Sequence, residues 1–164
     1  MLFKGNYAFA YLRIFDCLES HCNLACQVLL NFTMENKTTQ EMIIDLGGIS
    51  KILSKIPNIP QDGDFNFIIT GLRLMANILE IEKGPREFLT AGGVMMLTNI
   101  LKHYFEKILM LFKSETDDSS NAFAESFDAI DACGMIIETI VEDGKFSYLR
   151  RQMRLRERLL RLGS

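Results

Sequence analysis

The sequence has no tryptophan, and its 164 residues include only three prolines and two histidines. So few prolines favour helices, because proline interrupts helical hydrogen bonding. The histidines, His21 and His103, are accompanied by no Gly-x-Ser-x-Gly segment, phosphate-binding loop or His-Glu-x-x-His pair. We therefore expect a helical protein that is not an enzyme.

Long apolar runs and regular cysteine spacing are missing as well. No segment approaches the roughly 18 consecutive apolar residues of a membrane span, and the first 20 residues lack the features of a secretory signal. Of the four cysteines, Cys17, Cys22 and Cys26 lie close together in the sequence and Cys133 lies far from them, which does not resemble a disulfide framework. His21 points about 100° away from the face shared by Cys22 and Cys26. We expect no metal or cofactor, and a cytoplasmic or nuclear location.

The residues that are present suit one folded domain, with 48% hydrophobic and 24% charged residues. The net charge of −3 conceals an asymmetry. From Lys145 onward, seven basic residues face Glu157 alone, a net of +6, which leaves −9 for the rest of the chain. The sequence therefore predicts an acidic body with a basic C-terminal helix over residues 145–162.

An internal repeat organises the centre of the chain. Residues 23–56 and the segment beginning at Gly71 both read as helix, polar break, short helix, double glycine, helix. The pairs Gly47-Gly48 and Gly92-Gly93 lie 45 residues apart, and Asn31 and Asn77 lie 46 apart. Such a period is typical of helical repeat proteins. The expected helices are 23–33, 40–46, 49–56, 65–81, 88–91 and 94–112.

Local signals mark the ends of these helices. Thr38 or Thr39 is expected to cap the helix at 40–46. Gly47 is expected to adopt the left-handed conformation that closes a helix, and Pro85 to occupy a first helical turn.

Further segments flank the repeats. We expect a helix over 2–18, a connector over 57–64, an acidic loop over 113–121 and a helix over 122–141 that ends at Asp143-Gly144. The apolar surfaces near 2–18 and 103–112 exceed what one neighbour covers. We therefore expect a homo-oligomer, or cover from part of a longer chain.

Two kinds of segment resemble the armadillo repeat: A25-C-Q-V-L-L-N31 and G71-L-R-L-M-A-N77, and the corners I43-I-D-L-G-G-I49 and F88-L-T-A-G-G-V94. The resemblance covers about residues 20–142 and implies an all-α, short right-handed α-solenoid of three-helix repeats with flanking helices. In that family the helix bearing the asparagine lines a concave groove, and the amide binds the backbone of an extended partner.

Carried over to this chain, the resemblance assigns groove roles to Asn31 and Asn77, and places Glu138 at the equivalent position of a third copy. One turn earlier, where family members that bind nuclear localisation signals have tryptophan, this chain has Gln27, Arg73 and Gly134. A nuclear-import receptor is therefore not expected. The expected groove residues are Gln27, Asn31, Thr70, Arg73, Asn77, Asp131 and Glu138.

The expected function is a protein–protein interaction module or scaffold that holds an extended or helical segment of a partner protein. An asparagine amide has two donors and an acceptor, which match one peptide unit. Asn31 and Asn77 have a second interpretation, in which they only tie the following loop to the helix end.

A basic stripe in the last helix supports an alternative function. Its arginines are spaced at i+3 and i+4 and share one face. The stripe would bind nucleic acid or an anionic membrane, or would instead dock on the acidic body and cap the solenoid. It consists of Arg150, Arg151, Arg154, Arg158 and Arg161.

Overall fold

The computed structural model describes residues 10, 12–13, 21–56, 65–114 and 119–162, with side chains in the last helix up to Val141. Every element in these ranges is a helix, which confirms the all-α class. Most of the expected helix at 2–18 and the whole connector at 57–64 lie outside the described residues. The helices are α2 (Cys22–Thr33), α3 (Lys37–Asp45), α4 (Gly48–Lys55), α5 (Phe65–Leu79), α6 (Gly84–Thr90), α7 (Gly93–Ser114) and α8 (Ser119–Leu162).

The order of helices repeats as expected. A long or medium helix, a short helix and a third helix occur first as α2–α4 and again as α5–α7. Several expected boundaries are wrong. The short helix expected at 88–91 begins four residues earlier, as α6 at Gly84. Asn36 caps α3, because its side chain accepts the Thr39 N–H at 3.2 Å, and α3 therefore begins three residues earlier than expected. The acidic loop is shorter than 113–121, since α7 continues through Ser114 and α8 begins at Ser119.

The two double-glycine corners have the same local structure. Gly47 and Gly92 have left-handed φ values of +70° and +85°, and a Cβ at either would meet nothing within 4 Å. The second glycine of each pair lies against the residue five positions earlier: a Cβ at Gly48 would overlap Ile43, and a Cβ at Gly93 would overlap the Phe88 ring. Each corner thus combines a left-handed turn with a close helix contact that only glycine permits.

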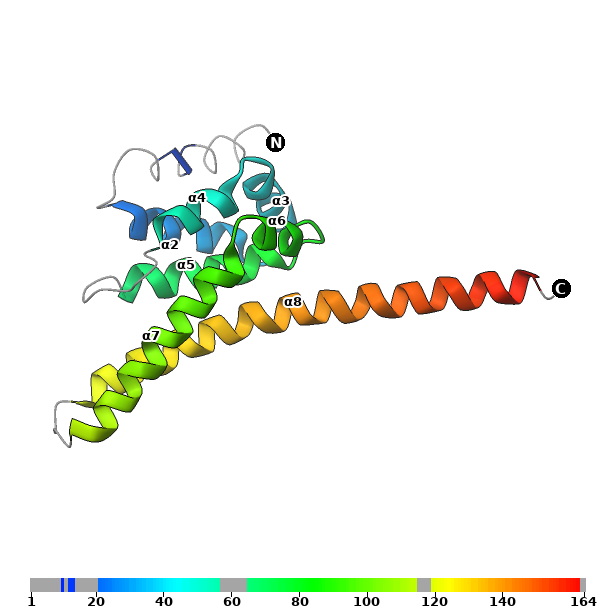
Figure 1. The fold of residues 1–164 in the computed structure, drawn as a ribbon. Coiled ribbons are helices and arrows are strands. Elements are labelled where there is room, and N and C mark those ends of the chain that lie inside the picture. Colours follow the sequence, from blue (N-terminus) through cyan, green and yellow to red (C-terminus); the bar gives the residue numbers. More distant parts are fainter. Residues whose placement is uncertain (1–9, 11, 14–20, 57–64, 115–118, 163–164) are drawn as a thin grey trace.

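Helix α5 lies at the centre of the molecule, packed against α2 on one side and α8 on the other, and α7 packs along α8 (Figure 1). Its buried residues include Leu72, Leu74 and Met75, each with no exposed surface. Leu12, from the part of the chain before α2, is also buried in this core. The helices α2, α5 and α8 therefore form one row, and these are the helices that carry Asn31, Asn77 and Glu138.

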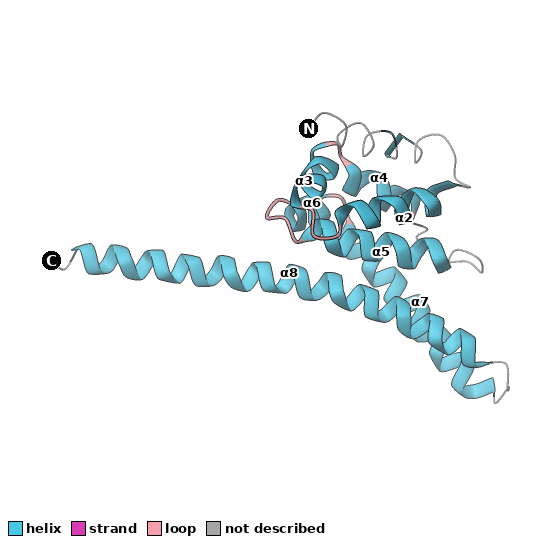
Figure 2. Ribbon diagram, turned by 180° about the vertical axis from the view of Figure 1, so that it is seen from behind, coloured by secondary structure: helices cyan, strands magenta, loops and turns pink. Residues whose placement is uncertain are grey.

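Helix α8 corrects the expected C-terminal organisation. It runs without a break through Asp143 and Gly144, so the separate helices at 122–141 and 145–162 are one helix of 44 residues. An interior glycine costs only about 1 kcal/mol relative to alanine, and good helix formers follow it here. The second half of α8 extends beyond the other described helices, as two opposite views show (Figures 1 and 2). It does not fold back as a cap on its own body.

Candidate protein-interaction surface

The central helix α5 has one open strip. Nine of its fifteen residues are buried, and the fully exposed ones are Asn66 and Arg73. Thr70 and Asn77 are half-buried and fall on the same side, because the spacings of four and seven residues return to one face of a helix. Three expected groove residues, Thr70, Arg73 and Asn77, therefore belong to the polar strip of α5, and the other residues of α5 that are not buried, Phe65 and Phe67, are half-buried against the core.

Helix α2 presents the next two expected residues. Gln27 and Asn31 are exposed and are four residues apart, so they share a face. The opposite face is buried and is made of small and medium side chains, including Ala25, Cys26 and Leu29.

The row of larger apolar residues on α2, Leu24, Val28 and Phe32, does not form the core face of this helix. Leu24 is 58% exposed and Phe32 is 44% exposed. The small residues Ala25 and Cys26 lie in the core instead, where they permit the close approach of α5 that large side chains would prevent. Leu24 is consequently an apolar neighbour of the exposed amides on α2.

The first half of α8 completes the row. Asp131 and Glu138 are exposed, and Gly134 between them is open, with no heavy atom within 4 Å of an added Cβ. All seven expected groove residues therefore lie outside the core on three helices that pack side by side. Within the described chain they make no hydrogen bond or ion pair with one another.

Asn77 has an internal partner. Its Nδ2 donates to the Thr33 hydroxyl at 3.4 Å, and that hydroxyl donates to the carbonyl of Leu30 at 2.9 Å. One amide hydrogen of Asn77 thus joins α5 to the C-terminal end of α2, which supports a structural role for this residue. Asn31 makes no such contact within the described chain and is exposed. The two asparagines are therefore not equivalent.

A buried glutamine adjoins this contact and was not expected from the sequence. Gln40 is 1% exposed, and its Nε2 donates to the Thr33 carbonyl at 3.0 Å and to Glu80 Oε2 at 3.4 Å. The Thr33 carbonyl, at the end of α2, also accepts the Asn36 N–H at 3.2 Å, so Gln40 adds a second hydrogen bond there. The signal in the sequence is its spacing, because Gln40 lies three and four residues before Ile43 and Ile44 and so shares the apolar face of α3.

The cysteines of the described chain are buried thiols. Burial raises the pKa of the Cys26 thiol to about 12, with a smaller contribution from Cys22, and burial likewise raises the pKa of Cys133 to about 12. Such thiols stay protonated at neutral pH and are poor nucleophiles and metal ligands. Within the described residues, no group of three His, Cys, Asp or Glu side chains is arranged to hold a metal ion.

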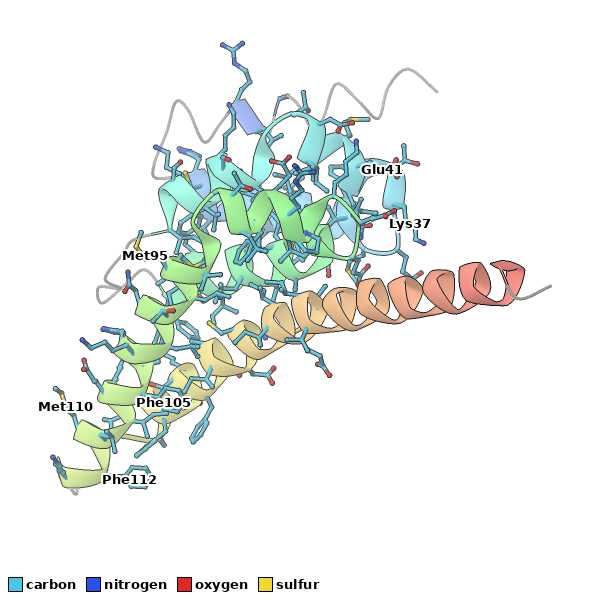
Figure 3. The ribbon with its side chains drawn as sticks, turned by 45° about the vertical axis from the view of Figure 1, so that its right-hand side comes forward. Lys37, Glu41, Met95, Phe105, Met110 and Phe112 are labelled. Atoms are coloured by element: carbon cyan, nitrogen blue, oxygen red, sulfur yellow. The ribbon has the colours of Figure 1, made fainter. Side chains whose placement is uncertain are left out.

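The excess apolar surface expected on residues 103–112 is present. Phe105, Leu109 and Phe112 are exposed on one side of α7, and Met110 projects from the other side (Figure 3). The Phe112 ring meets the edge of the Phe123 ring at a centroid distance of 5.1 Å, which extends this surface onto α8. What covers it stays a prediction.

The expected basic stripe, Arg150 to Arg161, lies on the second half of α8, where the backbone is helical but the side chains are outside the described ones. None of the described helices is both long and apolar enough to span a bilayer. Comparisons of the chain with protein-family models, with curated proteins and with solved structures find no match. The structure thus defines an all-helical protein with two similar three-helix units.

Proposed function

We propose that this chain is a short right-handed α-solenoid of armadillo-like units and acts as a non-enzymatic interaction module. The exposed row on α2, α5 and α8 binds an extended or helical segment of a partner protein. The observation that carries the proposal is the position of α5, whose only exposed residues lie along its polar strip and whose other residues are buried or, at Phe65 and Phe67, half-buried.

The chemistry of the row favours a polypeptide ligand. Gln27 and Asn31 supply amide donors and acceptors, which pair with the backbone of an extended segment. Leu24 and Met135 are exposed apolar residues on the same two outer helices. Arg73 is exposed and makes no ion pair within the described chain. Amides near apolar contacts suit recognition of backbone and side chains together.

Arg73 and Asn31 are the sharpest probes, because neither supports the fold through a described hydrogen bond. We expect Arg73→Glu and Asn31→Ala to weaken peptide binding by about tenfold each, the effect of losing roughly 1.4 kcal/mol. The binding probe is a random-peptide library displayed on phage and selected on the wild-type chain. Enriched peptides are then titrated against the variants by fluorescence anisotropy.

Arg86→Glu is the matched control, since Arg86 is an exposed arginine on α6, outside the row. Peptide affinity should be retained in this variant, and melting temperature should be unchanged in all three. A library that yields no binder, or binders equally insensitive to Arg73→Glu and Asn31→Ala, would rule out the row as a peptide site.

The projecting second half of α8 supports a second candidate, an association with nucleic acid or an anionic membrane through the Arg150–Arg161 stripe. The same proteins are titrated with labelled polynucleotide and with phosphatidylserine vesicles. No affinity even at low salt would exclude this alternative, because contacts to phosphates are strongest there.

A further inference from the structure

Helix α8 has a second apolar face besides the one in the core. Its core face includes Ala129, Cys133 and Ile136, all buried. Other apolar residues recur at alternating spacings of four and three on a different side of the helix, where Phe127 is 57% exposed and Val141 is 46% exposed. These belong to the stripe Phe123, Phe127, Ile130, Gly134, Ile137 and Val141. Two of its members are half-buried, because Ile130 packs partly against the core and Phe123 contacts Phe112.

The stripe follows a heptad repeat that continues along the helix. Every seventh residue from Phe127 is, in turn, Gly134, Val141, Tyr148, Leu155 and Leu162. The backbone is helical through Leu162, so these six register positions lie on one slowly turning line. The companion series Ile130 and Ile137 continues as Gly144, Arg151 and Arg158, so the second half of the helix keeps apolar residues at one of the two heptad positions. Apolar residues that recur every seven positions are typical of a helix that pairs with another helix.

The charges of α8 differ between its halves. From Ser119 to Val141 there are four acidic residues, Glu125, Asp128, Asp131 and Glu138, and no basic one. From Lys145 to Leu162 the net charge is +6. Parallel pairing with an identical helix would place like charges together, and antiparallel pairing places the acidic half beside the basic half of its partner.

We propose that two copies of this chain associate through antiparallel pairing of their α8 helices, with the two-fold axis between Val141 and Gly144. The paired length approaches the whole helix, about 66 Å for 44 residues at 1.5 Å per residue. A straight helix cannot fold back on itself, so the basic half reaches an acidic half only on a second molecule.

Most residues that meet across this axis are complementary in size or charge. Ile137 falls opposite Tyr148, Ile130 opposite Leu155, and Val141 opposite Gly144. Phe127 falls opposite Arg158, an arginine long enough to lay its apolar stem on a ring while its charged end reaches solvent. Gly134, which is open on its outer side, falls opposite Arg151, close to the exposed carboxylates of Asp131 and Glu138. A two-fold axis repeats every one of these layers, which makes the interface closed and self-complementary.

Two substitutions of nearly equal exposure test the interface. Ile137 is 42% exposed and lies on the stripe, whereas Met135 is 43% exposed and lies off the stripe, about 160° around the helix from Ile137. Light scattering and sedimentation equilibrium of the full chain are expected to give a dimer at micromolar concentration. Ile137→Glu should weaken association by roughly 100-fold, because it buries an unpaired charge in two layers. Met135→Glu should leave it unchanged.

A crosslinking experiment tests the orientation. Chains carrying I137C and chains carrying Y148C, one of them enlarged by a fusion tag, are mixed and oxidised, with the wild-type chain as a control for native thiols. Antiparallel pairing gives the disulfide between the two different chains. A monomer at micromolar concentration, a dimer equally sensitive to both glutamate substitutions, or disulfides only between identical variants would overturn the proposal.

Discussion

Single glycines determine how closely the helices of this protein approach one another. Gly93 is buried where a methyl group would overlap the Phe88 ring, and Gly92 beside it has a left-handed φ of +85°. Both requirements occur again at Gly47-Gly48. The repeated dipeptide is therefore a repeated piece of geometry, in which one residue turns the chain and the next allows the contact.

Alanine substitutions should separate these two roles. Gly93→Ala is expected to lower the free energy of unfolding by about 1–3 kcal/mol through overpacking against Phe88, and Gly92→Ala by about 1–2 kcal/mol through its left-handed backbone. Ser50→Ala is the control, and is expected to change stability by no more than about 0.5 kcal/mol, since Ser50 is exposed on α4. Urea denaturation measures all three. Equal effects of Gly93→Ala and Ser50→Ala would mean that Phe88 does not constrain the corner.

The buried thiols make stability depend on alkaline pH. The folded state raises the pKa of Cys26 from 9.0 to about 12, so the native thiol holds its proton more tightly than the unfolded one. The contribution of the protonated Cys26 thiol to the free energy of unfolding is fully present below pH 9 and is lost as pH rises toward about 12. The free energy of unfolding of the wild type should therefore fall more between about pH 8 and about pH 10 than that of Cys26→Ala. Parallel falls in the two proteins would contradict this.

At the scale of helices, sequence patterns predicted which elements exist better than where they begin. The repeated units, the left-handed Gly47 and the early Pro85 are all confirmed. The cap of α3 was misplaced because Thr38, Thr39 and Asn36 are all good capping residues. Only the path of the chain after α2 determines which of them faces the free N–H groups.

The cap can be tested directly. Asn36→Ala should cost about 1 kcal/mol, because the Thr39 N–H loses its acceptor. Thr38→Ala should change stability by no more than about 0.5 kcal/mol, since Thr38 is exposed on α3. Thermal or urea unfolding of both variants gives the comparison. A larger loss of stability in Thr38→Ala than in Asn36→Ala would mean that Thr38, as the sequence predicted, caps the helix.

Helix faces are also decided beyond the helix itself. On α2, hydrophobicity alone favours Leu24 and Phe32 as core residues, yet both are exposed and Ala25 and Cys26 are buried. Ala25 and Cys26 take the core positions because α5 packs closely against that side of α2. On α8, the glycine after Asp143 was a reasonable helix end, but no competing contact or proline stops the helix.

At the scale of the whole molecule, two surfaces have separate roles. The polar row on α2, α5 and α8 is the proposed site for a partner segment, and the heptad stripe of α8 is the proposed contact with a second copy. On α8 the two surfaces lie close together, since Asp131 follows Phe127 by four residues. Asp131 and Glu138 belong to the row and also lie beside Arg151 in the proposed dimer, so the two proposals share one side of α8. Arg73→Glu, on α5, tests the row away from this shared side, and Ile137→Glu tests the stripe.

The amino-acid sequence by itself determined the helical class, the two repeated units, the glycine corners and the opposed charges of body and tail. These features depend on spacing and on backbone freedom, which neighbouring residues along the chain define. Only the tertiary structure decided that α5 opens a single strip, that Asn77 is partly engaged with Thr33, and that α8 extends unbroken beyond the body. The reason is physical, since exposure and hydrogen bonding depend on which distant helix packs against a face, and local sequence does not specify that neighbour.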